Sequence, residues 1–227
     1  MKRRILAIGL LFVMGIFIGT LAWAGGESER IEAANKILST VMTGPQGDAP
    51  RYLLSHARGI ILVPGLKKAG FIVGIKRGKG VIVARDKEGK WLGPCFITIS
   101  GGSLGFQAGA KSSDLVLLLM SDRAVQKFTG NKIKIGVDLG VVAGPVGKEI
   151  GLSQEDLNKV EIFSYMREKG IFAGATISGS VVSHDEKANQ NFYGTSVTFK
   201  DILCGKKISL PSVARELLQT LQSFSSR

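Results

Sequence analysis

Apolar side chains recur every three or four residues near both ends of this chain, which is the spacing of amphipathic helices. The first such stretch runs from Glu27 to Met42 and is ended by Gly44 and Pro45. The second begins after Pro211, a residue that suits the first turn of a helix. The apolar stripes consist of Ile31, Ala34, Leu38 and Val41 in the first helix and of Ala214, Leu217, Leu218, Leu221 and Phe224 in the last. Each stripe must pack against another part of the protein.

Between these helices the pattern changes to short β-branched runs that glycine interrupts. Glycine supplies 30 of the 227 residues without a fixed period, which is typical of many turns between strands. The predicted strands cover residues 60–63, 71–75, 81–85, 96–100, 115–120, 133–142, 161–166, 172–177 and 192–199. Short helices are predicted at 51–57, after Ser121 and at 152–158, and a hairpin turn at 86–89. We expect a single α+β domain: a largely antiparallel, glycine-rich β-sheet or partly closed barrel covered by the N- and C-terminal helices.

The first 24 residues have the pattern of an export signal. Three basic residues precede an uncharged run from Ile5 to Ala22, and Ala22-Trp23-Ala24 forms a small-x-small cleavage site. This pattern predicts a secretory signal peptide over 1–24, cleavage after Ala24, and one mature domain over 25–227. The protein would then be periplasmic, or bound to a membrane outside the cytoplasm. Because the uncharged run is also nearly long enough to span a bilayer, an uncleaved anchor stays open.

The cysteines and histidines are too few for the common metal sites. Two cysteines exclude a four-thiolate zinc site and a disulfide framework, and His56, Cys95, His184 and Cys204 lack the paired spacing of zinc ligands. We therefore expect no metal and no cofactor. In an oxidising compartment Cys95 and Cys204 could form a disulfide, but their apolar neighbours fit two separately buried thiols equally well.

No segment has the pattern of a catalytic or nucleotide-binding site. Gly78-Lys79-Gly80 leads into a predicted strand rather than the helix that a dinucleotide-binding loop requires. Gly147-Lys148 is followed by Glu149, where a phosphate-binding loop needs Ser or Thr. Ser183-His184-Asp185 contains the residue types of a catalytic triad, but neighbouring residues of a strand point apart, so we interpret it as a polar turn. We expect no catalytic residues and no enzymatic activity.

Positive charge is the clearest chemical feature. The chain has 30 Lys and Arg against 18 Asp and Glu, a net charge of +12, and residues 67–90 hold eight basic and two acidic residues. Cations beside aromatic residues suit an anionic phospholipid surface, although strand-flanking lysines also protect sheet edges from aggregation. The candidate lipid-binding residues are Lys67, Lys68, Lys76, Arg77, Lys79, Arg85 and Trp91. We expect three of them, Lys76, Arg77 and Lys79, to project from one turn. A secreted protein does not ordinarily meet nucleic acid, so we expect no nucleic-acid partner.

Several segments, taken in order, are similar to a known family. They include Lys68-Ala69-Gly70-Phe71, Gly89-Lys90-Trp91, Gly105-Phe106-Gln107, Ala143-Gly144-Pro145-Val146-Gly147-Lys148, and Ser164-Tyr165 with Lys169-Gly170-Ile171-Phe172-Ala173-Gly174. In this order they resemble the SYLF domain, a lipid-binding module also found beside SH3 domains, over about residues 31–224. The resemblance implies an α+β fold, binding of phosphoinositides or other anionic lipids in eukaryotic members, and actin association in some fungal members.

One difference from the family concerns the lipid-binding segment. Eukaryotic members use an N-terminal amphipathic segment for membrane contact, whereas the first mature helix here carries Glu27, Glu29 and Glu32, which anionic lipid would repel. We therefore expect an exported protein that binds anionic lipid, or another anionic envelope component, through its basic surface. The alternative is a structural or adaptor protein of the envelope that binds a protein partner. The sequence does not determine the oligomeric state or the lipid species.

Overall fold

The computed structural model describes residues 26–70, 73–104, 109–146, 152–194, 197–203, 205 and 208–226. The predicted signal peptide and Cys204 lie outside the described residues. The helices are α1 (Glu27–Thr43), α2 (Asp48–His56), α3 (Asp122–Lys127), α4 (Gln154–Lys159), α5 (Glu186–Tyr193), α6 (Phe199–Leu203) and α7 (Ser212–Ser225). The strands are β1 (Gly59–Gly70), β2 (Val73–Arg85), β3 (Trp91–Leu104), β4 (Gly109–Leu119), β5 (Lys132–Ile135), β6 (Val141–Ala143), β7 (Ile162–Glu168), β8 (Ile171–Gly174) and β9 (Ser180–His184).

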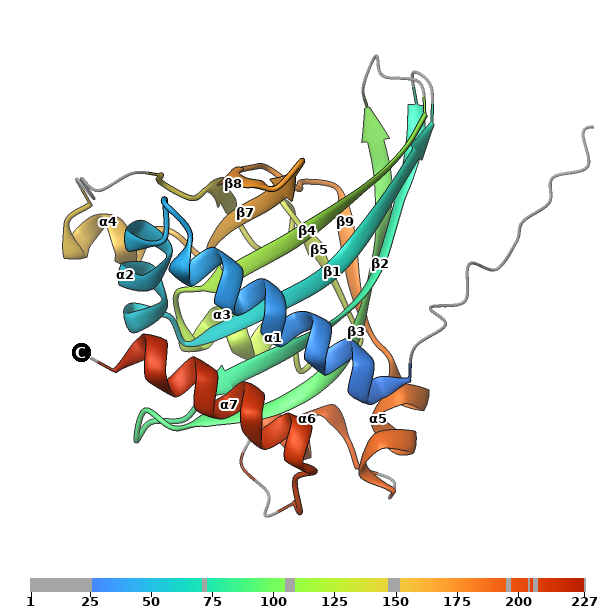
Figure 1. Ribbon diagram of the computed structural model, residues 1–227, viewed down its shortest axis with the longest axis vertical. Helices are drawn as coiled ribbons and strands as arrows, with labels where there is room; N and C mark the ends of the chain where they lie inside the picture. Colours follow the sequence, from blue (N-terminus) through green and yellow to red (C-terminus); the bar gives the residue numbers. More distant parts are fainter. Residues whose placement is uncertain are drawn as a thin grey trace, which may run out of the picture.

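These strands form one strongly curled sheet (Figure 1). Their order is β5-β9-β3-β2-β1-β4-β7-β6, with β8 paired to β7, and among these pairs only β6 and β7 run parallel. The sheet curls into a half-barrel, and α1 and α7 lie side by side across its outer face (Figure 1). The α+β expectation, with a largely antiparallel sheet and covering terminal helices, is confirmed.

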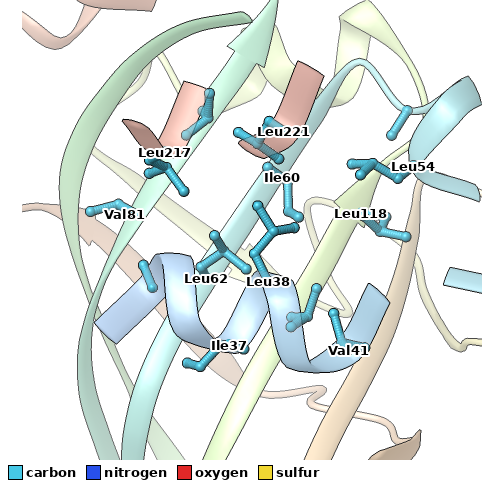
Figure 2. Close-up of a cluster of buried hydrophobic side chains, with 14 of the residues drawn as sticks. Ile37, Leu38, Val41, Leu54, Ile60, Leu62, Val81, Leu118, Leu217 and Leu221 are labelled. Atoms are coloured by element: carbon cyan, nitrogen blue, oxygen red, sulfur yellow. The ribbon is translucent and has the colours of Figure 1, made fainter. Parts of the chain in front are cut away.

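Both faces of the central strands are buried at residues 60–63 of β1 and 81–84 of β2. Ile60 and Leu62 point to the outer face and pack against α1, α2 and α7, whereas Ile61 and Val63 point inside the curl, towards α3 and α6. Figure 2 shows Leu38 of α1 beside the outer-facing side chains of β1. A strand that is buried on both faces has a continuous apolar sequence, which explains the unbroken run at 60–63.

Two polar contacts fix the terminal helices to the sheet. Arg30 of α1 is buried, and its Nη1 lies 2.9 Å from Oδ2 of Asp185, the residue that caps α5. The Trp91 indole donates a hydrogen bond of 3.0 Å to Ser225 at the end of α7. Within the described residues, no helix combines the length and the hydrophobicity needed to cross a membrane.

Four local predictions were wrong. The described residues of the strand predicted at 192–199 do not form a strand: Asp185 caps α5 on its N-terminal side, Gly194 ends that helix with a left-handed backbone at φ 65°, and Phe199 begins α6. The predicted strand at 133–142 is divided into β5 and β6 by a turn. The strands predicted at 71–75 and 81–85 belong to one strand, β2, whose described part begins at Val73. Ser183 and His184 belong to a further strand, β9, instead of a polar turn.

Candidate lipid-binding site

The basic residues of β2 lie in a strand rather than on a turn. Lys76 and Arg77 pair with Lys68 and Lys67 of β1, and all three basic residues, Lys79 included, pair with residues of β3 in antiparallel register. Because successive side chains of a strand point to opposite faces, Arg77 and Lys79 share one face of the sheet and Lys76 lies on the other. The expectation that these three cations project from one turn is therefore corrected.

Side-chain alternation along β1 and β2 places three cations on the outer face of the sheet. Figure 1 shows that β1 and β2 extend past α1 on this face. We call Lys67, Arg77 and Lys79 the outer basic face. Lys67 and Arg77 are register partners and both are exposed, and Lys67 Nζ lies 3.2 Å from Ser112 Oγ. Ile75 lies on the same face and is 69% exposed. The described strands β1, β2 and β3 contain no Asp or Glu, so no carboxylate of these strands neutralises the surface.

Lys68 and Lys76 point to the opposite face, inside the curl. Lys68 Nζ lies 3.3 Å from Glu168. Lys76 is only 7% exposed, and its ammonium donates hydrogen bonds to the carbonyl oxygens of Ile177, at 3.4 Å, and Ser178, at 3.2 Å. Burial, and then repulsion from Lys68, lower the pKa of Lys76 below that of an ordinary lysine. Lys76 therefore fixes the loop before β9 instead of facing a ligand surface.

Arg85 and Trp91 lie at the other end of β2 and β3, far from the outer basic face. Arg85 donates a hydrogen bond of 3.0 Å to the Ser55 carbonyl at the end of α2, and its guanidinium lies 4.4 Å from the centre of the Trp91 ring. Burial, and then repulsion from Arg58, lower the pKa of Arg85. Trp91 is buried. These contacts join α2, α7 and the sheet. Of the seven candidate residues, three therefore share the outer basic face, where Lys67 and Arg77 are exposed and Lys79 is half-buried.

The triad-like residue types have structural roles. Nε2 of His184 lies 2.7 Å from the Phe128 carbonyl oxygen, and its ring stacks on Phe199 with centroids 3.7 Å apart. Asp185 caps α5 and pairs with Arg30. Among the described residues, no three His, Cys, Asp or Glu side chains are grouped to hold a metal ion. Cys95 is buried in the sheet, and its pairing with Cys204 stays untested.

An apolar pocket of about 330 Å³, which the sequence analysis missed, opens on the outer face of the sheet. It lies between the end of α1, the loop before α2 and the β7–β8 hairpin. Its walls include Thr40, Val41, Pro45, Tyr165, Ile171 and Phe172.

Tyr165 forms a fixed wall of this pocket. Its hydroxyl donates a hydrogen bond of 2.9 Å to the Pro145 carbonyl, and burial raises the pKa of the phenol. A Cβ on Gly144 would overlap the Tyr165 ring, so only glycine fits against it. Both residues belong to segments already noted in the sequence, but nothing there shows that they meet.

Comparison with known proteins identifies relatives over most of the chain. The family model described as "Ysc84: Las17-binding protein actin regulator" matches residues 100–224. The human "SH3 domain-containing YSC84-like protein 1" is 34% identical over 189 residues, which are 83% of this chain and 55% of that protein. "Protein YSC84" of Saccharomyces cerevisiae is 36% identical over 204 residues, 87% of this chain and 43% of that protein. The chain thus spans about half the length of the curated relatives it matches.

Proposed function

Because the chain belongs to the Ysc84 family, the family of the SYLF domain, we propose that it binds lipid without catalysis, using the outer basic face to recognise anionic phospholipid or another anionic envelope component. The observation that carries this proposal is the arrangement of Lys67, Arg77 and Lys79. They share one side of the sheet, where the described strands β1, β2 and β3 contain no Asp or Glu, next to the exposed apolar side chain of Ile75.

The charges favour reversible attachment to a membrane. Each Lys or Arg near an anionic surface contributes about 1 kcal/mol, so the outer basic face contributes about 3 kcal/mol. Ile75 can enter the interfacial region beside these cations. The relevant surface is thus a rigid sheet, which holds the three cations in fixed positions.

The position of α1 supports a sheet-based mode. Ile31, Leu38 and Val41, which form its apolar stripe, are buried in the core, while Glu29 and Glu32 face solvent. Lipid contact through the apolar face of α1 would require this helix to leave the core, and its exposed face is acidic. The outer basic face needs no such rearrangement.

A charge-reversal variant tests the proposal. In Lys67→Glu, Arg77→Glu, Lys79→Glu the outer basic face changes by six charge units. Affinity for vesicles containing anionic phospholipid should fall by about a hundredfold or more, since about 3 kcal/mol is lost and every 1.4 kcal/mol is a factor of ten. Cosedimentation measures the affinity, with neutral vesicles and a thermal melt alongside.

The matched control reverses three exposed cations elsewhere: Arg123→Glu, Lys132→Glu, Lys134→Glu. It has the same net charge as the test variant but an intact outer basic face, so it should retain most of the binding. If the two variants bind anionic vesicles equally while both remain folded, the outer basic face is only a solvated surface.

Export is the second part of the proposal. Its support is the basic start, the uncharged run and the Ala22-x-Ala24 site of the sequence. Protein recovered from the cell envelope should have a mature N-terminus at Gly25, which intact-mass analysis measures. A full-length mass in that fraction would indicate an uncleaved anchor instead.

A protein partner is the second candidate function. The matched family model is described as a Las17-binding protein and actin regulator, and the animal relatives are named as SH3 domain-containing. An adaptor with an apolar interface should bind its partner with little dependence on salt, whereas lipid binding through the outer basic face should weaken steeply as ionic strength rises.

A further inference from the structure

We propose that the apolar pocket beside Tyr165 binds one acyl chain of a lipid, an inference that rests on the proposed lipid-binding function. The walls of the pocket are almost entirely apolar, and the polar groups of two of them are internally satisfied: Thr40 donates to the Lys36 carbonyl at 2.7 Å, and Tyr165 to that of Pro145 at 2.9 Å. Such a lining favours a ligand that makes no hydrogen bonds along its length.

The size of the pocket favours a chain over a single amino-acid side chain. A cavity of about 150 Å³ is enough to hold benzene. The pocket, at about 330 Å³, has more than twice that volume, so one aromatic side chain of a protein partner would leave much of it unfilled. It has room for roughly ten groups of the size of a water molecule, and a methylene group is of similar size.

The mouth of the pocket carries exposed apolar side chains. Ile171 is 66% exposed and Val146 is 48% exposed, and both line the pocket. Exposed apolar groups that gather at one place mark an interaction surface for protein or membrane. Here they form a continuous apolar path from the surface to Tyr165 and Phe172, along which a chain can enter.

The pocket and the outer basic face lie on the same side of the sheet at a distance that suits one lipid molecule. Lys67 pairs with Ser112 of β4, and Tyr165 pairs with Val116, four residues further along that strand. Across the strands, the Cα atoms of Lys67 and Tyr165 are two strand spacings of about 4.8 Å apart, and along the strands they are four residues of about 3.3 Å apart. These two perpendicular distances combine to a separation of roughly 16 Å. One leaflet of the hydrocarbon core is about 15 Å thick, so a chain whose headgroup lies near Lys67 can reach the pocket.

One polar atom in the lining has no partner. Gln46 lines the pocket, and its Oε1 is buried without a hydrogen bond to any described residue. A hydroxyl or amide hydrogen of a bound lipid can satisfy this acceptor. The pocket thus combines apolar walls with one unpartnered side-chain acceptor, which suits the acyl chain of a lipid that also carries a hydroxyl or amide group.

The test uses a soluble probe, so that the pocket is measured separately from the membrane surface. The fluorescent fatty acid cis-parinaric acid is titrated into the protein without vesicles. We expect saturable binding at one site, displaced by dodecanoate but not by butanoate or by N-acetylphenylalanine amide. Absence of saturable binding overturns the proposal, as does equal displacement by the phenylalanine derivative, which would indicate a site for a protein side chain.

Two matched substitutions locate the site. Thr40→Trp fills the pocket from α1, whereas Thr220→Trp makes the same change on α7; both threonines are half-buried helix residues whose hydroxyls donate to the carbonyl four residues earlier. Thr40→Trp should weaken probe binding at least tenfold and Thr220→Trp less than twofold. Equal affinities in the two variants would overturn the assignment.

A third variant keeps the test valid if Thr40→Trp does not fold. Ile171→Asp changes an exposed residue at the mouth and should lower probe affinity at least fivefold; unchanged binding would contradict the proposal. Because the carboxylate of the probe can lie near Lys67, the charge-reversal variant of the outer basic face should bind the probe more weakly than the parent. Its affinity for uncharged dodecanol, measured by displacement of the probe and dependent on the pocket alone, should stay within twofold of the parent. In the parent, vesicle binding without dodecanol binding, or dodecanol binding without vesicle binding, therefore shows which of the two proposals fails.

Discussion

The ion pair between Arg30 and Asp185 provides a direct test of how firmly α1 is fixed to the sheet. Their side chains are 4% and 15% exposed, Nη1 and Oδ2 are 2.9 Å apart, and the guanidinium lies 5.0 Å from the centre of the Phe96 ring. Arg30→Met keeps an apolar stem of similar length but leaves the Asp185 carboxylate without its cation.

The expected loss follows from this burial. Removing one partner of a buried ion pair costs about 3–5 kcal/mol, because the remaining charge is uncompensated. Asp185 still accepts a hydrogen bond of 3.3 Å from the Ala188 backbone N–H and keeps some contact with water, which places the loss near the lower end, at about 3 kcal/mol. For a domain of this size each kcal/mol lowers the Tm by about 2–4 °C, so the Tm should fall by about 6–12 °C.

Urea unfolding followed by circular dichroism measures the free energy for four proteins: the parent, Arg30→Met, Asp185→Asn and the double variant. The double variant should lose less than the sum of the two single losses, by about 1–2 kcal/mol, because Asn leaves no charge behind. Lys159→Met is the control: it breaks the exposed pair with Glu155, whose side chains are 67% and 77% exposed, and should change stability by less than about 0.5 kcal/mol. If Arg30→Met lowers the free energy of unfolding no more than this control, the ion pair does not fix α1 to the sheet.

Two further predictions concern Lys76 and the cysteines. A lowered pKa means that the folded state holds the Lys76 proton less tightly than the unfolded state, so the stability of the parent relative to Lys76→Met should rise as the pH increases towards 10.5. Urea unfolding at several pH values checks the sign, and a falling difference would contradict it. The double variant Cys95→Ser, Cys204→Ser should still fold, with a loss of about 1–3 kcal/mol in the free energy of unfolding. The loss arises because a polar hydroxyl is then buried at position 95, where it faces the Phe199 carbonyl oxygen, which lies 3.7 Å from Sγ in the parent. Failure to fold under oxidising conditions would show that the cysteines are required.

The terminal helices could be predicted because their signal is local. The apolar stripes of α1 and α7 repeat with the helix period, and Ser121 caps α3 as its sequence suggests. Strand continuity was harder to predict. In the sequence Gly78 and Gly80 favour a turn, but in the structure a Cβ on Gly78 would lie 2.8 Å from a methyl group of Val63. These glycines provide space beside β1, and a sequence does not distinguish this requirement from a turn.

The candidate site depended on information that a single sequence lacks. The sequence correctly located positive charge between residues 67 and 90, but the sheet divides these residues between two faces and two ends. The face on which Lys67 and Lys68 lie depends on a bulge in β1 between Val63 and Leu66. The bulge adds residues to β1 relative to its partner strands, and no local sequence pattern shows how many. The pocket joins Thr40, Tyr165 and Ile171, which meet only after the sheet has curled.

The most direct test of the central claim measures where the protein touches lipid. In a background with Cys95 and Cys204 replaced, an environment-sensitive fluorophore is attached at Ser100→Cys, the exposed register partner of Arg77, or at Ser223→Cys, on the exposed side of α7. With vesicles containing anionic phospholipid, the label at position 100 should shift to the blue and return in high salt, while the label at position 223 should not change. Equal shifts at both positions, or a shift at 223 alone, would contradict lipid binding through the outer basic face.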